Sequence, residues 1–145
     1  MEIRPLELSE IDIAVQLIWD VFMQFEAPDY MQEGIDTFWE FIHNREVIAS
    51  RQLWGAFDED TIVGAIVFEA ARSHINCFFV KAGYQKQGIG KKLWESVKNT
   101  NSVDTVTVNS SPYAVEIYHK LGFEDTDCEQ LRNGIRYTPM IYHKV

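Results

Sequence analysis

The sequence predicts one α/β domain over residues 1–145, with a mixed central sheet flanked by helices. The length of 145 residues is typical of a single domain. The apolar fraction of 46% is that of a chain with an ordinary buried core. Segments with strand and helix periodicity follow one another in the order βααβββαβαββ. Two of the helices lie between strands in the second half, so they predict crossovers and some parallel pairing.

The chain begins with a predicted strand and two predicted helices. Residues 1–7 are expected to form an edge strand, since Pro5 cannot donate a hydrogen bond to a neighbouring strand. Apolar residues then recur at helical spacing from Ile11 to Phe25, and Pro28 ends this helix. A second helix is expected over residues 33–44.

Three consecutive strands are predicted in the middle of the chain. Residues 52–57 and 61–70 are rich in β-branched and apolar side chains, and the polar turn at residues 58–60 joins them into a hairpin. Residues 74–80 form the third of these strands. A loop containing glycines follows over residues 83–90.

The second half alternates helices with strands. A helix is predicted over residues 91–98 and a strand over residues 103–108. Pro112 suits the first position of the next helix, and Gly122 suits its end. The chain then finishes in further strands, the last of them over residues 137–145.

Composition excludes several classes of function. The net charge of -9 argues against a nucleic-acid partner. No apolar stretch approaches the length of a membrane span, and the N-terminus lacks the apolar core of a signal peptide, so we expect a cytoplasmic protein without a membrane partner. Two cysteines without a neighbouring histidine cluster predict no metal site and no disulfide framework. Residues 1–80 have 4 basic and 15 acidic side chains, which suits either solubility or a cationic acceptor.

The loop after the third strand has the features of an anion site. Gly83, Gly88 and Gly90 allow tight turns, and the helix that follows presents unpaired N–H groups at its N-terminus. Residues 81–100 also have five lysines against one glutamate. The P-loop pattern fails because Ile89 stands where lysine is required. The dinucleotide fingerprint fails because Leu93 stands where a small residue is required.

A third pattern fits this loop. Gln85-Lys86-Gln87-Gly88-Ile89-Gly90 has the form Gln-x-x-Gly-x-Gly directly after a strand. A second block follows at residues 109–123, with Ala114, then Tyr118, then Leu-Gly-Phe at residues 121–123. Both blocks and the order of elements resemble the GNAT-type N-acetyltransferases, and the resemblance covers essentially the whole chain.

The resemblance implies acetyl-CoA as co-substrate and Tyr118 as the general acid that protonates the departing thiolate. The pyrophosphate would lie on backbone N–H groups of the loop, and the pantetheine arm would pair with the strand end, where a bulge exposes an N–H group, plausibly that of Val80, to the thioester oxygen. Ser111 stands where many members have asparagine. The implied cofactor-binding residues are Phe79, Val80, Gln85, Lys86, Gln87, Gly88, Ile89, Gly90, Lys91, Asn109 and Ser111.

The acceptor side is predicted with less support from motifs. His74 is a candidate base or substrate contact, Glu26 a candidate partner for the substrate amine, and Glu69 a further candidate. Direct attack by the amine needs no covalent enzyme intermediate, so Cys77 is not implied as a nucleophile. Trp39 and Trp54 are expected to pack in the core.

These inferences favour an N-acetyltransferase that acetylates a primary amine, more plausibly on a small molecule than on a protein. The alternative is a non-catalytic acyl-CoA-binding or regulatory module on the same fold, since a fold does not dictate an activity. A nucleotide-binding domain is a third hypothesis. The resemblance also makes a homodimer plausible.

Overall fold

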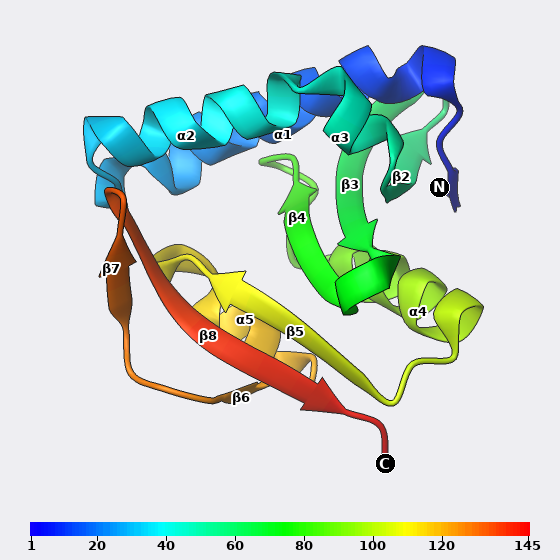
Figure 1. Ribbon diagram of the computed structural model, residues 1–145. Helices are drawn as coiled ribbons and strands as arrows, with labels where there is room; N and C mark the ends of the chain where they lie inside the picture. The colour runs from blue at the N-terminus through cyan, green and yellow to red at the C-terminus, as the bar shows by residue number, and fades with distance from the viewer.

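An eight-stranded mixed sheet organises the chain, which the computed structural model describes throughout, residues 1–145 (Figure 1). The strands lie in the order β1-β2-β3-β4-β5-β8-β6, and β7 pairs only with β8. All pairs are antiparallel except β4 with β5. The strands span β1 Glu2–Pro5, β2 Gln52–Asp58, β3 Thr61–Glu69, β4 His74–Val80, β5 Thr105–Ser110, β6 Glu124–Asp125, β7 Gln130–Arg132 and β8 Ile135–His143.

Helices cover both faces of this sheet. The first two lie over one face and bury their apolar sides against one core cluster, whereas the last two border a second cluster on the opposite face (Figure 1). Within the first helix, Ile11, Val15, Ile18 and Phe22 recur every three or four positions and therefore form one buried stripe. The helices span α1 Ile11–Phe25, α2 Gln32–His43, α3 Arg45–Ala49, α4 Ile89–Asn101 and α5 Val115–Lys120.

The parallel strands β4 and β5 pair only at their beginnings. His74 lies opposite Thr107 and Ile75 opposite Val108, and no later residues of the two strands are paired. The register against β3 shifts at the same place, so that Asn76 is an extra residue in β4, as in a β-bulge. Figure 1 shows the two strands diverging beyond this point. The sheet is therefore split along this line, and backbone groups on the inner edges of the split lack strand partners.

The hairpin of β7 and β8 reaches across to the start of α2. Its turn, Asn133-Gly134, has positive φ at both residues, which is the geometry of a two-residue hairpin loop. The Met31 N–H donates to the Gly134 carbonyl at 2.9 Å. A Cβ added at Gly34 would lie 2.4 Å from the same carbonyl oxygen, so only glycine allows this approach. The hairpin and α2 together close one side of the split sheet.

The predicted mixed sheet flanked by helices is confirmed, with four differences in its elements. Three strands, β6, β7 and β8, follow α5 where two were predicted. The short helix α3 was not predicted; the Asn44 side chain caps it by accepting the Val47 N–H at 3.2 Å. Helix α4 begins at Ile89 and reaches Asn101, a longer span than predicted. Only the α4 crossover joins adjacent parallel strands, because β8 inserts between β5 and β6 after α5.

The two tryptophans expected in the core differ in burial. Trp39 is 46% exposed and stacks on His43 of the same helix, so its predicted core position is wrong. The helical spacing of α2 places it on the outer face, where no other element covers it. Trp54 is half-buried against the second core cluster. No helix of the chain combines the length and apolarity needed to cross a membrane.

Candidate active site

The loop between β4 and α4 presents a row of unpaired backbone N–H groups. The N–H groups of Gln85, Lys86, Gln87 and Gly88 donate to no acceptor within the chain. Gly88 has φ +83° and precedes the helix without a side-chain cap, so the first-turn N–H groups of α4 are also free. These donors, together with the positive end of the helix dipole, form a cradle suited to an anion such as a pyrophosphate.

Both glutamines of the loop motif hold the loop itself. The Gln85 side-chain amide donates to the Val80 carbonyl at 3.0 Å, and its oxygen accepts from the Tyr113 hydroxyl at 2.9 Å. Gln85 thus fastens the loop to the end of β4 and to the turn before α5. The Gln87 amide donates to the Gly83 carbonyl at 3.0 Å. Their side chains therefore fix the conformation in which the backbone N–H groups face outward.

A cavity of about 540 Å³ extends from this cradle into the split in the sheet. Seven of the predicted cofactor-binding residues line it: Phe79, Val80, Gln85, Lys86, Gly88, Gly90 and Lys91. Ile89 does not, because its side chain is 4% exposed and belongs to the core beneath α4. Gln87 does not, because its amide is turned back onto the loop. Lys120 of α5 adds a third lysine to the lining.

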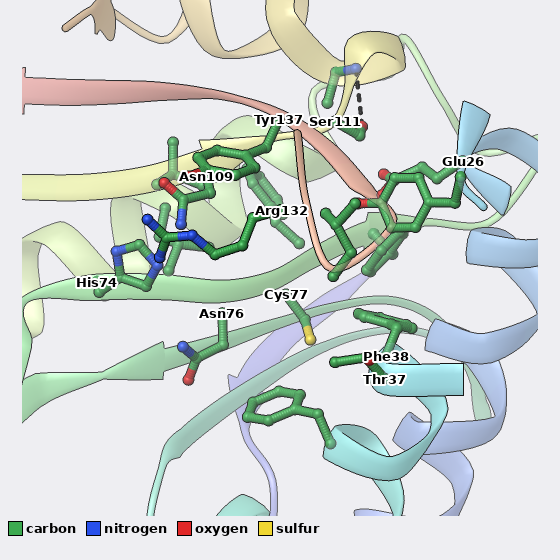
Figure 2. A pocket seen from close by; sticks show the side chains of 18 of the residues that line it. Glu26, Thr37, Phe38, His74, Asn76, Cys77, Asn109, Ser111, Arg132 and Tyr137 are labelled. Atoms are coloured by element: carbon green, nitrogen blue, oxygen red, sulfur yellow. Dashed lines mark hydrogen bonds between the residues drawn. The ribbon is translucent and has the colours of Figure 1, made fainter. Parts of the chain in front are cut away.

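A second cavity of about 340 Å³ lies on the other side of the split. It is bordered by α2, by β4 and β5, and by the β7–β8 hairpin, and it opens to solvent beside Asn109 and Arg132, which are exposed. Asn109 and Ser111 line this smaller cavity and not the larger one, which differs from the cofactor contact implied for them. The reason is that β5 diverges from β4, so the end of β5 lies away from the loop between β4 and α4 (Figure 1). The Ser111 hydroxyl is also engaged, since it accepts the Ala114 N–H at 3.3 Å (Figure 2).

The two cavities share one wall, and it contains two ionisable groups. Glu26, from the end of α1, and Tyr118, from α5, line both cavities; the other shared residues are Phe78, Phe79 and Ala114. Tyr118 is 5% exposed, and none of the side-chain hydrogen bonds of the chain involves its hydroxyl. Burial, with the nearby Glu26 carboxylate adding to the effect, raises the pKa of Tyr118 well above its usual 10. The side chain is therefore a neutral hydroxyl donor at the junction.

Glu26 is the group at this junction that can titrate near neutral pH. Burial raises the pKa of its carboxyl to about 7, with the Ser111 hydroxyl lowering it and Asp29 raising it further. Burial also raises the pKa of the neighbouring Cys77 thiol and of the Tyr30 phenol. Both stay protonated at neutral pH, so Cys77 is not an activated thiolate.

His74 and Glu69 occupy different positions from Glu26. His74 lines only the smaller cavity, where its Nδ1 lies 2.7 Å from the Thr107 hydroxyl; burial and the charge of Arg72 lower its pKa. Figure 2 shows His74 across the cavity from Glu26. Glu69 lines neither cavity, and its carboxylate is bound by Arg72 and Asn76, which lowers its pKa to about 2.

Sequence reasoning missed most of the smaller cavity. The walls that were missed come from α2 and from the β7–β8 hairpin, which are far apart in the chain and contain no motif. The apolar side chains of α2 were recognised, but only as core residues. The missed lining residues include Tyr30, Thr37, Arg132 and Tyr137.

The split mixed sheet thus has an anion cradle at the end of β4 and two cavities that meet at Glu26 and Tyr118. A family model described as "Acetyltransferase (GNAT) domain" matches residues 26–144. The chain belongs to the GNAT acetyltransferase family. The loop and the Tyr118 block by which the sequence resembles that family therefore identified it correctly.

Solved structures with low sequence identity share the fold. A GCN5-related N-acetyltransferase from Rhodopseudomonas palustris is 18% identical, with a TM-score of 0.80 over 99% of this chain and 95% of that one. PaiA N-acetyltransferase from Thermoplasma acidophilum, in complex with coenzyme A, is 18% identical, with a TM-score of 0.78 over 99% and 98%. An aminoglycoside 6'-N-acetyltransferase complexed with coenzyme A is 13% identical, with a TM-score of 0.67 over 99% and 97%. A search of curated proteins finds no significant match.

Proposed function

We propose that the protein transfers an acetyl group from acetyl-CoA to a primary amine of a small molecule. The observation on which this rests is the meeting of two cavities at Glu26 and Tyr118. One cavity begins at an anion cradle, and the other is bordered by α2 and the hairpin. A thioester in the first and an amine in the second would therefore meet beside one proton donor and one proton acceptor.

The larger cavity suits the co-substrate by the chemistry of its lining. Loop N–H groups and the lysines at positions 86, 91 and 120 match a pyrophosphate. The Lys81 N–H donates to the Val63 carbonyl of β3 at 2.8 Å, so the backbone groups of Val80, one residue earlier, face the split. Val80 could thus pair with the pantetheine arm and offer its N–H to the thioester oxygen, where negative charge develops.

The proposed proton transfers use the two residues of the shared wall. Acetyl-CoA supplies the acetyl group as a thioester. The amine nitrogen forms a bond to the acetyl carbon while the bond from carbon to sulfur breaks. The Tyr118 hydroxyl donates a proton to the departing sulfur, and the Glu26 carboxylate receives the proton that the amine nitrogen must lose. His74 is left as a contact for the acceptor, because it lies across the cavity from Glu26.

The contact between α2 and the β7–β8 hairpin at one side of the smaller cavity favours a small acceptor over a protein segment. Contact between Gly34 and Gly134 joins α2 to the hairpin, so a polypeptide could not lie across this side of the split without separating them. The volume of about 340 Å³ corresponds to roughly ten water-sized groups at ~30 Å³ each.

Calorimetry with acetyl-CoA is the first test. The unmutated protein should bind acetyl-CoA, and Gly88→Glu should abolish binding, because a carboxylate would then occupy the anion cradle. Release of free CoA thiol in the presence of a panel of amines then measures turnover. Binding without turnover on any amine would support the non-catalytic acyl-CoA-binding module, and competition by ATP or NAD would support a nucleotide-binding domain. Absence of binding by the unmutated protein would contradict the proposal.

A further inference from the structure

The smaller cavity is polarised from one side to the other. Its lining contains one carboxylate, Glu26, at the wall shared with the larger cavity, and one guanidinium, Arg132, from the end of β7. Figure 2 shows Arg132 across the cavity from Glu26, with its guanidinium directed toward His74 and Asn109. A molecule that fills the cavity would therefore meet opposite charges at its two ends.

Arg132 differs from every other arginine of the chain. The sequence contains six arginines, and the other five form ion pairs with carboxylates: Arg4, Arg45, Arg51, Arg72 and Arg136. Arg132 has no ion pair and no side-chain hydrogen bond within the chain. Its neighbour on the same hairpin, Arg136, binds Glu129 at 3.1 Å outside the cavity. The unpaired guanidinium is thus the one that faces the cavity.

Two further side chains near Arg132 have polar groups without a hydrogen-bond partner in the chain. The Asn109 side chain makes no hydrogen bond within the chain, and His74 uses only its Nδ1, leaving Nε2 free. The hairpin fixes the backbone of Arg132, since this residue pairs with Ile135 across a two-residue turn that is held on α2, and the Arg132 side chain is exposed to solvent at its side of the cavity. Between the two ends, the walls are mostly apolar, with Phe38, Phe41 and Val108 among them.

We propose that the acceptor is a small amino carboxylate, whose carboxylate is bound by Arg132 and Asn109 while its amine lies at Glu26 and Tyr118. This inference rests on the proposed acetyl transfer and specifies its substrate class. A guanidinium matches a carboxylate through two parallel N–H donors. The apolar middle of the cavity suits an acceptor whose two charged groups are joined by a hydrocarbon portion.

Matched pairs of acceptors test this proposal. Amino acids are compared with their decarboxylated amines in the thiol-release assay, for the unmutated protein and for Arg132→Gln. We expect kcat/KM for the amino acids to fall roughly 10- to 100-fold, mainly through KM, and kcat/KM for the amines to stay unchanged. Arg132→Lys should recover part of the loss, because it restores charge but not the paired donors. Arg136→Gln on the same hairpin is the control, and it should leave kcat/KM unchanged for both the amino acids and the amines. A preference of the unmutated protein for the decarboxylated amines, or an equal loss on both acceptors, would overturn the proposal.

A direct binding measurement separates this proposal from acetyl transfer itself. N-acetylated amino acids are titrated calorimetrically into the protein saturated with CoA, and N-acetylated amines without a carboxylate serve as controls. Binding that requires both the carboxylate and Arg132 supports the anion site even when no amine is turned over. Turnover of amines without any carboxylate-dependent binding leaves acetyl transfer standing and rejects the role of Arg132.

Discussion

The two cavities recognise their proposed ligands through different parts of the chain. The larger cavity begins at backbone N–H groups of a loop whose shape depends on a few glycines and two glutamines. The smaller cavity is built from side chains on α2, β4, β5 and the β7–β8 hairpin. Backbone recognition demands a local sequence and so leaves a motif, whereas side-chain recognition across distant elements leaves none. One end of the site can therefore be recognised in the sequence, whereas the other becomes visible only in the structure.

Tyr118→Phe should have the largest effect, because Tyr118 belongs to the wall that both cavities share. Turnover should fall roughly 10²- to 10⁴-fold, the range for a lost general acid. Acetyl-CoA affinity and the thermal midpoint should change little, since the hydroxyl makes no hydrogen bond in the chain and the ring keeps its packing on Phe78 and Phe123. Thiol release, calorimetry and thermal unfolding measure the three quantities. An unchanged kcat would reject the acid role.

Glu26→Gln is expected to change both the rate and its dependence on pH. In the unmutated protein, kcat/KM should rise as the pH increases through about 7, because the carboxyl must lose its proton before it can accept one from the amine. The variant should lose roughly 10²-fold in kcat/KM at pH 8 and should lack this rise. A pH profile of kcat/KM for both proteins provides the measurement; an identical rise in the variant would assign it to another group.

Glu26→Gln should lower activity but raise the stability of the folded protein at high pH. Burial raises the pKa of Glu26 from 4.5 to about 7 in the folded protein, so the folded state holds this proton more tightly. The contribution of Glu26 to stability is therefore complete below pH 4.5 and is lost as the pH rises through about 7. Glu26→Gln should raise the free energy of unfolding at pH 8 by at most ~3 kcal/mol. Denaturant unfolding at pH 4 and pH 8 checks this, and the gain should nearly vanish at pH 4, below the unfolded pKa.

The sequence was sufficient for the fold and the family, and its motifs led to the proposal for the cofactor side of the site. Loop residues from Gln85 to Lys91 and the block around Tyr118 have fixed local roles, and both were found. Ile89 and Gln87 were predicted to contact the cofactor; their side chains belong to the core and the loop, so only their unpaired backbone N–H groups are left for that contact. Arg132 could not be predicted, because its position depends on β8 inserting beside β5 and on the glycine contact between the hairpin and α2. Such contacts have no local signal in the chain.

A matched pair of glycine substitutions should separate the two regions. Gly34→Ala places a Cβ 2.4 Å from the Gly134 carbonyl oxygen, so the hairpin must move away from α2. We expect a loss of about 1–3 kcal/mol in stability and a raised KM for the acceptor, with acetyl-CoA affinity unchanged. Gly90 lines the larger cavity instead. In Gly90→Ala, the added Cβ would lie 3.4 Å from the Phe78 ring, which is an ordinary van der Waals contact. It should weaken acetyl-CoA binding without loss of stability. A raised acetyl-CoA Kd in Gly34→Ala would show that the two regions are coupled.

Lys86→Ala should have the smallest effect and is the most specific test of backbone recognition. Lys86 lines the larger cavity, but its side chain is solvent-accessible, so its attraction for a phosphate is screened by salt and worth only about 0.3–1 kcal/mol. Acetyl-CoA affinity should therefore fall roughly two- to five-fold at low salt and less at high salt, while kcat stays unchanged. Titrations at two ionic strengths check this. A loss as large as that of Gly88→Glu would mean that charge, and not the row of N–H groups, holds the pyrophosphate. Both cavities would then recognise their ligands through side chains, and the contrast between them would no longer hold.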